Sequence, residues 1–230
     1  MRASFLLLIY TLIVILVGPV LLVFWVLGLR EPLMAIGRWA MRIGRRVLGI
    51  DVEVSGLERF DHKASYVFMP NHVSFLDGPL MVVVIPQSVR AIMKKNVFGI
   101  PILGWAMRYV GCVPVDRRAG GGGIKSIKKA VRFIREKGYS FLIFPEGTRS
   151  LDGKLQRFRR GGFFLAIAGG APIVPVTIGG TFELMPKGQF GAKRGTVSAV
   201  FHPPVLVDGY SEGNVAELVE KVRAAVSSGL

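Results

Sequence analysis

From residue 51 to the C-terminus, short runs of β-prone apolar residues alternate with segments of helical periodicity. The strand-like runs cover residues 52–54, 66–69, 91–93, 112–115, 140–144, 173–178 and 197–201. The helix-like segments cover residues 77–84, 102–109, 124–137, 161–168 and 215–226. This alternation is typical of α/β proteins, and the nearly continuous apolar character of the runs is typical of strands covered on both faces. We therefore predict an α/β domain over residues 51–230, with a mixed, largely covered β-sheet flanked by helices.

Residues 1–50 differ from this domain in composition. No charged side chain occurs from Phe5 to Leu29, and this apolar run is longer than the roughly 20 residues needed to cross the hydrocarbon core of a bilayer. No small-residue cleavage site follows it, so a retained anchor is expected rather than a signal peptide. Gly18-Pro19 lies in the middle of the run, where proline disfavours a straight helix. The run is therefore expected to form one kinked span or a re-entrant pair of shorter helices.

Residues 30–50 predict a second, amphipathic helix. Opposite faces of this helix carry the charged and the apolar side chains, namely Arg38, Arg42, Arg45 and Arg46 against Ile36, Ala40, Ile43 and Val47. Together with Trp39, this pattern suits a helix that lies in the headgroup layer of a membrane. The alternative is an ordinary surface helix packed on the domain. Positive charge is denser after the apolar run than before it, which favours a main domain on the cytoplasmic side.

The formal net charge is +15, from 30 Lys and Arg against 15 Asp and Glu. Such an excess indicates anionic partners: membrane phospholipid, a phosphorylated substrate, an acidic carrier protein or nucleic acid. The basic segments lack the interleaved aromatic residues of a nucleic-acid platform, so nucleic acid is not expected. A single cysteine, Cys112, excludes an internal disulfide. The three histidines, His62, His72 and His202, have no metal-ligand spacing, so no metal is predicted.

The first candidate for catalysis is Asn71-His72-x4-Asp77, which follows a strand-like run. A neutral histidine can accept the proton of an alcohol near neutral pH. A carboxylate that accepts from its other ring nitrogen would fix the tautomer and stabilise the imidazolium. Ser74 is a candidate N-cap for the helix expected at 77–84, which would place Asp77 in the first turn. A helix-capping histidine beside an unrelated surface aspartate is the alternative interpretation.

The second candidate is the segment 144–150, which reads FPEGTRS and ends another strand-like run. Ligand sites of α/β folds form at the carboxyl ends of strands. The guanidinium of Arg149 suits a phosphate, and backbone amides around Gly147 can add to it. A surface turn with an ion pair would not explain the basic run that follows: Lys154, Arg157, Arg159 and Arg160. A base beside an anion site predicts transfer of a group to an alcohol of a phosphorylated substrate.

Together the two segments resemble the glycerolipid acyltransferase family, and most closely its bacterial 1-acyl-sn-glycerol-3-phosphate acyltransferases. Two further blocks agree with this resemblance. Lys94-Lys95, Ile100-Pro101-x2-Gly104 and Val115-Asp116-Arg117 resemble the second block of the family, and APIVPV at 171–176 resembles the fourth. The four blocks occur in family order between residues 67 and 178.

The resemblance implies transfer of a fatty acyl chain to the sn-2 hydroxyl of lysophosphatidic acid, giving phosphatidic acid in phospholipid biosynthesis. The donor would be acyl-CoA or acyl carrier protein, and no other cofactor is implied. His72 would deprotonate the hydroxyl and Asp77 would hold His72. The phosphate would be bound by Glu146, Gly147, Thr148 and Arg149, with Lys94 and Arg117 as further candidates. The residues that would support the motifs are Asn71, Ser74, Pro145 and Arg159.

One difference from the family concerns the phosphate site. The family commonly has Phe-Lys-x-Gly where this chain has Phe158-Arg159-Arg160-Gly161. Arginine keeps the charge but changes the donor geometry, so phosphate recognition is expected to persist while the headgroup preference stays open.

Several alternatives fit the same residues. The acceptor could be another lysolipid or glycerol 3-phosphate, and the protein could be a lysophospholipid hydrolase or a non-enzymatic basic membrane-binding module. No Gly-x-Ser-x-Gly elbow occurs, and Cys112 lies in an apolar run, so direct transfer without an acyl-enzyme is expected. The resemblance places the anchoring segment 1–50 in the bacterial inner membrane and the domain 51–230 on its cytoplasmic face.

Overall fold

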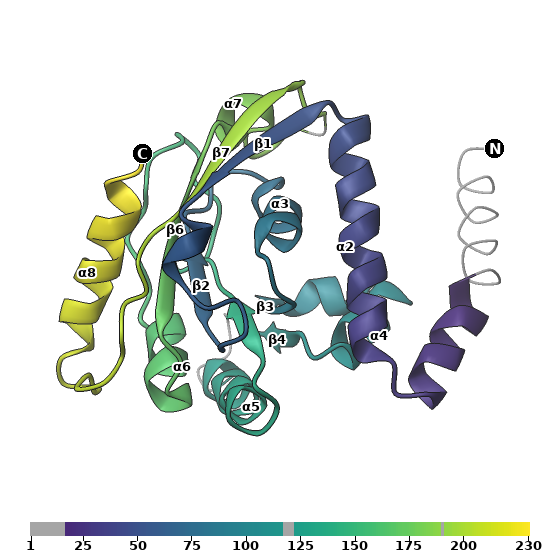
Figure 1. The fold of residues 1–230 in the computed structure, drawn as a ribbon, viewed down its shortest axis with the longest axis horizontal. Helices are drawn as coiled ribbons and strands as arrows, with labels where there is room; N and C mark the ends of the chain where they lie inside the picture. Colours follow the sequence, from purple (N-terminus) through teal and green to yellow (C-terminus); the bar gives the residue numbers. More distant parts are fainter. Residues whose placement is uncertain (1–16, 117–121, 190) are drawn as a thin grey trace.

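The computed structural model describes residues 17–116, 122–189 and 191–230. Its centre is a seven-stranded sheet in the order β1-β7-β6-β2-β5-β3-β4 (Figure 1). The strands are β1 (Ile50–Ser55), β2 (Val67–Pro70), β3 (Val89–Lys94), β4 (Val113–Val115), β5 (Ser140–Leu142), β6 (Ile173–Gly179) and β7 (Gly195–Phe201). Each neighbouring pair is parallel except β6 and β7. The predicted mixed sheet is confirmed.

Helices flank this sheet. They are α2 (Arg30–Val47), α3 (Asp77–Val84), α4 (Leu103–Tyr109), α5 (Gly122–Lys137), α6 (Gly161–Gly169), α7 (Thr181–Leu184) and α8 (Val215–Ser227), with short 3-10 helices η1 (Leu57–Arg59) and η2 (Lys95–Gly99). The sequence predicts five of these helices after residue 51 and misses α7. That helix has four residues, which is about one turn and too short to show a helical period.

Both faces of the sheet are covered, because its strands are apolar on both sides. Alternate side chains of a strand point to opposite faces, and β2 shows the consequence. Val67 and Met69 pack into a core formed with α5, α6 and α8, whereas Phe68 packs into a second core formed with α3. In Figure 1, α5, α6 and α8 lie on one side of the sheet and α3 lies on the other.

The strand directions determine where a site can form. The strands β2, β3, β4, β5 and β6 run the same way, whereas β7 is antiparallel to β6 and β1 follows β7. The carboxyl ends of five strands therefore meet at one edge, here called the carboxyl edge. The loops that follow β6, β2, β5 and β3 lie there in that spatial order, at the edge where open α/β sheets place their ligands.

The N-terminal segment is a helical hairpin over the part that is described. Residues 17–26 are helical, so Gly18-Pro19 lies inside a helix, and the part of the predicted apolar segment before residue 17 lies outside the described residues. The chain turns back at Gly28, which has a φ of 70°, and α2 follows (Figure 1). Within the three described stretches, no helix is both long and apolar enough to cross a membrane.

Helix α2 rests on the domain through a side that includes two of its arginines. Leu33 packs against the small cluster of buried residues beneath it. Arg38 donates to the backbone oxygen of Gln87, and Arg45 donates to that of Ile50 at 2.6 Å. Two of the four arginines predicted to share one face, Arg38 and Arg45, thus point toward the domain, where backbone carbonyls accept their hydrogen bonds.

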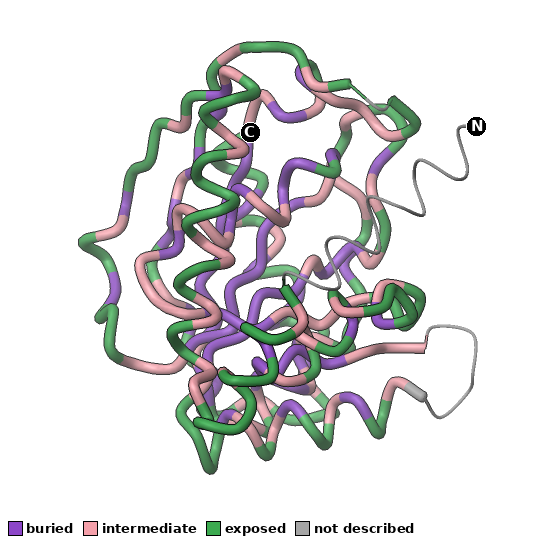
Figure 2. Tube along the Cα trace, turned by 90° about the vertical axis from the view of Figure 1, so that its right-hand side faces the viewer, coloured by how far each residue is buried: buried purple, intermediate pink, exposed green. Residues whose placement is uncertain are grey.

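A set of apolar side chains on the hairpin is exposed. We call it the hairpin surface, and its residues are Val20, Val23, Val26, Ile36, Trp39, Ile43 and Val47. Each of these side chains is between 39% and 76% exposed. Figure 2 views the side of the molecule that carries this hairpin. An exposed apolar area of this kind marks an interaction surface rather than an ordinary solvated one.

A buried histidine joins β6, β7 and α8. The hydroxyl of Thr177 donates to the backbone oxygen of Val226 at 2.7 Å and lies 2.8 Å from Nε2 of His202. Because the hydroxyl proton is used by the carbonyl, Nε2 of His202 carries a hydrogen and donates to Thr177. Burial, and to a lesser extent the charge of Arg59, lower the pKa of His202. The histidine is therefore neutral in the folded protein at neutral pH.

This arrangement predicts a pH-dependent stability. The unfolded histidine takes up a proton near pH 6.5 but the folded one resists it, so stability that is present above about pH 6.5 is lost as the pH falls. We expect the Tm to fall more in the wild type than in His202→Gln between about pH 7.5 and pH 5.5. His62→Gln, at an exposed histidine, should behave like the wild type. Equal losses of Tm in the wild type and His202→Gln would contradict the assignment.

Candidate active site

His72 and Asp77 meet at the carboxyl edge. His72 lies in the loop after β2, and Asp77 is the first residue of α3. The Nδ1 atom of His72 is 2.8 Å from Oδ2 of Asp77, and the side chains are 20% and 0% exposed. Since Asp77 is the acceptor, Nδ1 carries the hydrogen and Nε2 is left as the basic nitrogen. The geometry excludes the alternative of an unrelated surface aspartate.

The carboxylate of Asp77 is surrounded by donors. The backbone amides of Val73 and Ser74 each donate to Oδ2 at 2.8 Å. The hydroxyl of Thr181 donates to Oδ1 at 2.7 Å. With the ring of His72, these groups satisfy both oxygens of a carboxylate that is completely buried, which a charge in the interior requires. The pair is thus held in one geometry by the protein itself.

The loop of His72 is attached to the segment that follows β6. The side-chain amide of Asn71 donates to the backbone oxygen of Ile178 at 2.9 Å and its oxygen accepts from the Ile178 amide at 2.7 Å. The hydroxyl of Ser74 donates to the backbone oxygen of Met185 at 2.7 Å. The N-cap position of α3 is Leu76 rather than Ser74, so the predicted cap is wrong, although the Ser74 hydroxyl accepts from the Leu76 amide at 3.1 Å.

The segment 144–150, the third of the four family blocks, lies directly against the first block, residues 71–77. The rings of His72 and Phe144 stack with their centroids 4.0 Å apart, and the amide of Ser150 donates to the backbone oxygen of His72 at 2.9 Å. Stacking on a fixed aromatic ring restricts the imidazole to one plane. The carboxyl ends of β2 and β5 thus bring together two motifs that are about seventy residues apart in the sequence.

Glu146, predicted to bind the phosphate, instead accepts hydrogen bonds from two backbone amides. Its Oε1 accepts the backbone amide of His72 at 2.6 Å, and its Oε2 accepts that of Gln156 at 3.0 Å. The side chain is buried, and burial raises the pKa of its carboxyl while the two amides act to lower it. Both oxygens are thus used within the protein, and the residue ties the two loops of the site together.

The cationic residues of the third block remain available to an anion. The guanidinium of Arg149 lies 5.7 Å from the ring centroid of Phe75, in the same loop as His72. In the ion pairs found over residues 17–116, 122–189 and 191–230, neither Arg149 nor Arg159 has a carboxylate partner. Arg149 is half-buried and Arg159 is exposed. The two side chains therefore offer positive charge beside the loop of His72.

Gly147 makes room for Arg159. Its φ of 75° is one that side chains disfavour, and a Cβ atom there would lie 2.9 Å from Cδ and Nε of Arg159. The amide of Arg159 donates to the backbone oxygen of Pro145 at 2.8 Å, which holds the arginine over the turn. Thr148 is exposed at the tip of this turn. The absence of a side chain at Gly147 thus lets the side chain of Arg159 pass over the loop at 144–150.

The second block contributes less to the described site. Lys94 ends β3 and is exposed at the carboxyl edge, with β5 between its strand and β2. Its neighbour Lys95 lies 3.8 Å from Asp116. Arg117, the other predicted residue of this block, lies outside the described residues. Only Lys94 can therefore be placed on the same edge as His72.

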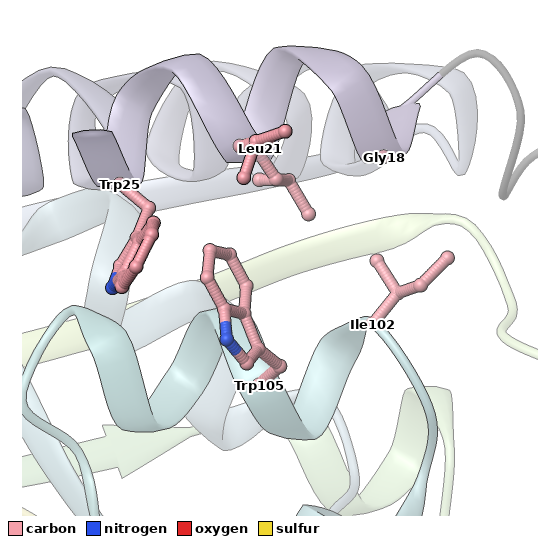
Figure 3. A pocket seen from close by; sticks show the side chains of 6 residues that line it. Gly18, Leu21, Trp25, Ile102 and Trp105 are labelled. Carbon is pink, nitrogen blue, oxygen red and sulfur yellow. The ribbon is translucent and has the colours of Figure 1, made fainter. Parts of the chain in front are cut away.

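An apolar cavity of about 500 Å³ lies between the helix at 17–26 and the start of α4 (Figure 3). Its lining consists of Gly18, Leu21, Leu22, Trp25, Ile102 and Trp105. In Figure 3, Trp105 points from α4 toward Leu21 on the other helix. Since the lining has no charged group, the cavity suits an apolar ligand group and not a phosphate.

The contacts of Glu146 lead to a testable prediction. In Glu146→Gln the new NH2 group must face one of the two backbone amides, so one buried hydrogen bond becomes a donor–donor contact. Such a loss lowers the free energy of unfolding by about 1–3 kcal/mol. Each kcal/mol lowers the Tm by about 2–4 °C in a protein of this size. Calorimetry should show this loss, whereas Glu217→Gln, at an exposed position of α8, should keep the wild-type Tm. An unchanged Tm in Glu146→Gln would contradict the structural role.

The chain is similar in sequence to known acyltransferases. The family model described as Acyltransferase matches residues 51–179. The chain is 37% identical over 155 residues to a chloroplastic 1-acyl-sn-glycerol-3-phosphate acyltransferase of Brassica napus, covering 66% of this chain and 44% of that protein. It is 31% identical over 195 residues to a 1-acyl-sn-glycerol-3-phosphate acyltransferase of Pseudomonas aeruginosa, covering 83% and 73% of the two chains.

A solved structure is similar over nearly the whole chain. The crystal structure of the 1-acyl-sn-glycerophosphate acyltransferase from Thermotoga maritima has a TM-score of 0.80 and 29% identity, and the match covers 96% of this chain and 90% of that one. The chain spans less than half the length of the Brassica napus relative. The match of the family model over the strands that form the site shows that this chain belongs to the acyltransferase family.

Proposed function

We propose that this protein transfers a fatty acyl group from a thioester, acyl-CoA or acyl carrier protein, to the sn-2 hydroxyl of lysophosphatidic acid. One observation carries the proposal: the His72–Asp77 pair lies at the carboxyl edge beside the guanidinium groups of Arg149 and Arg159, which have no carboxylate partner among the residues that the structure describes. The names of the relatives and of the similar solved structure support the same acceptor. The product is phosphatidic acid.

The chemistry follows from the tautomer of His72. Nε2 takes the proton of the acceptor hydroxyl while its oxygen attacks the thioester carbonyl, and Asp77 stabilises the imidazolium through the 2.8 Å bond to Nδ1. The new C–O bond forms, the C–S bond breaks, and the departing thiolate takes the proton from Nε2. General-base action of this kind contributes roughly 10²–10⁴-fold. No covalent acyl-enzyme is needed because the thioester is already activated.

The phosphate of the acceptor would lie against the third block. Arginine binds phosphate oxygens through paired N–H donors, and Arg149 and Arg159 are the side chains that offer them next to the loop of His72. Lys94 is a further candidate from the same edge, and so is Arg117, although it lies outside the described residues. Binding the anionic end would fix the acceptor with its hydroxyl near the base, which is how positioning accelerates a transfer.

We also propose that the hairpin surface docks on the cytoplasmic face of the bacterial inner membrane. The acceptor is an amphiphile that stays in a bilayer, and an apolar helix with flanking arginines suits the boundary between headgroups and acyl chains. Trp39 is 61% exposed on this surface, and indole rings favour that boundary. The apolar cavity lined by the helix at 17–26 adds further apolar surface to the hairpin.

The reaction can be tested by its products. We expect purified protein given oleoyl-CoA and lysophosphatidic acid to release CoA and form phosphatidic acid, as detected by mass spectrometry. His72→Ala should lower the rate by at least about 10²-fold, because the base is lost. Monoacylglycerol, which lacks the phosphate, should be a much poorer acceptor. Release of free fatty acid in place of phosphatidic acid would indicate a hydrolase, and the absence of turnover would indicate a binding module.

Membrane docking leads to a separate prediction. Trp39→Glu should weaken co-sedimentation with vesicles of anionic phospholipid by about tenfold or more, because a charge would enter the apolar layer. Leu206→Glu is the matched control, since Leu206 is 62% exposed and lies in the segment between β7 and α8. It should bind vesicles like the wild type. Equal binding by all three proteins would exclude docking through the hairpin surface.

A further inference from the structure

Thr181 contacts the catalytic pair from outside every motif that the sequence singles out. Its hydroxyl donates to Oδ1 of Asp77 at 2.7 Å, across 104 positions of sequence. It begins α7, which follows β6, and its side chain is fully buried. It also lies beyond residues 51–179, the range that the family model matches.

The two oxygens of Asp77 have unequal surroundings. Oδ2 accepts from the ring of His72 and from the amides of Val73 and Ser74. Over the described parts of the chain, Oδ1 has a single donor, which is Thr181. Removing the hydroxyl therefore leaves a buried carboxylate oxygen without a hydrogen bond. The carboxylate of Asp77 can then rotate more freely about its Cβ–Cγ bond.

We propose that Thr181 is a positioning residue that orients the carboxylate of Asp77 and thereby sets the proton equilibrium of the His72–Asp77 pair. The inference rests on the acyl transfer proposed above. A hydroxyl that donates to a carboxylate stabilises its negative charge. Without that donor the carboxylate attracts a proton more strongly, and the pair becomes protonated, and inactive as a base, at a higher pH than in the wild type.

The other charged groups around the pair are left in place. Glu146 accepts the backbone amide of His72, and Arg149 lies over Phe75 in the same loop. On α7 the charged residue is Glu183, which is exposed, and α3 has no other titratable residue besides Asp77. A change of pH profile in a Thr181 variant therefore reports on the hydroxyl and not on a lost charge.

The test compares Thr181→Val, Thr181→Ser and a matched control, Thr177→Val. Thr177 is equally buried, but its hydroxyl bonds to His202 and to the backbone of Val226 and has no contact with Asp77. Each variant is assayed with oleoyl-CoA and lysophosphatidic acid from acid to neutral pH, and its Tm is measured alongside. The pH profile and the separate kcat and KM values are readouts that a merely structural loss would not move.

We expect Thr181→Val to have about 3- to 10-fold lower kcat, the effect of one lost hydrogen bond, with an unchanged KM for the acceptor. The acid limb of its kcat/KM profile should lie at a pH about half a unit higher or more. Thr181→Ser should restore both quantities. Thr177→Val should lower the Tm while keeping the wild-type acid limb.

A wild-type acid limb in Thr181→Val would overturn the proposal, and so would an equal displacement in Thr177→Val or a failure of Thr181→Ser to restore the profile. Histidine-selective NMR distinguishes a failure of the Thr181 proposal from a wrong choice of acceptor substrate, because the NMR measurement needs no turnover. The chain has three histidines, and the signal of His72 is identified by its loss in His72→Gln. Its titration should move to higher pH in Thr181→Val whether or not lysophosphatidic acid is the substrate.

Discussion

The burial of the Asp77 carboxylate is the constraint around which the site is built. A charge with no solvent exposure is stable only if the protein supplies its hydrogen bonds. Those bonds come from the ring of His72, from two backbone amides of the preceding loop and from the Thr181 hydroxyl. The loop after β2 must therefore wrap around the first turn of α3, and the segment after β6 must close over it.

The parallel arrangement of the central strands explains why distant motifs meet. His72 follows β2, Glu146 follows β5, Lys94 ends β3 and Thr181 follows β6. In the sheet these strands are neighbours in the order β6-β2-β5-β3. Because they all run in one direction, their carboxyl ends lie at one edge of the sheet. The base and its orienting acid both follow β2, whereas the hydroxyl that restrains the acid follows β6 and the cationic groups follow β5 and β3.

The sequence predicts those features that local patterns determine. Every predicted strand and every helix predicted after residue 51 is present, and α3 has the predicted bounds, Asp77 to Val84. The meeting of His72 with Asp77 is also predictable, since it spans only five positions. These features depend on residue type and short spacing, both of which a single sequence displays.

The features that the sequence does not predict involve backbone partners or distant contacts. Glu146 binds two backbone amides, and such partners leave no signal in residue type. Thr181 meets Asp77 across 104 positions, and a threonine after a strand is too common to stand out. Arg38 and Arg45 belong to a face that periodicity marks as charged, yet carbonyls of the domain accept their hydrogen bonds.

The attachment of the hairpin connects the proposed membrane side to the site. Arg90 on β3 is 2% exposed, pairs with Glu31 of α2 and donates to the backbone oxygen of Val110 at 3.2 Å. The hydroxyl of Tyr109 donates to the backbone oxygen of Phe24 at 2.6 Å, which ties the helix at 17–26 to α4. A buried arginine that lost its carboxylate would leave an uncompensated charge, so the pair resists separation. The hairpin surface therefore has one orientation relative to the carboxyl edge. An enzyme with an amphiphilic acceptor needs such a fixed orientation. The acyl chain of the acceptor must lie at the hairpin surface while its reacting hydroxyl lies at the carboxyl edge.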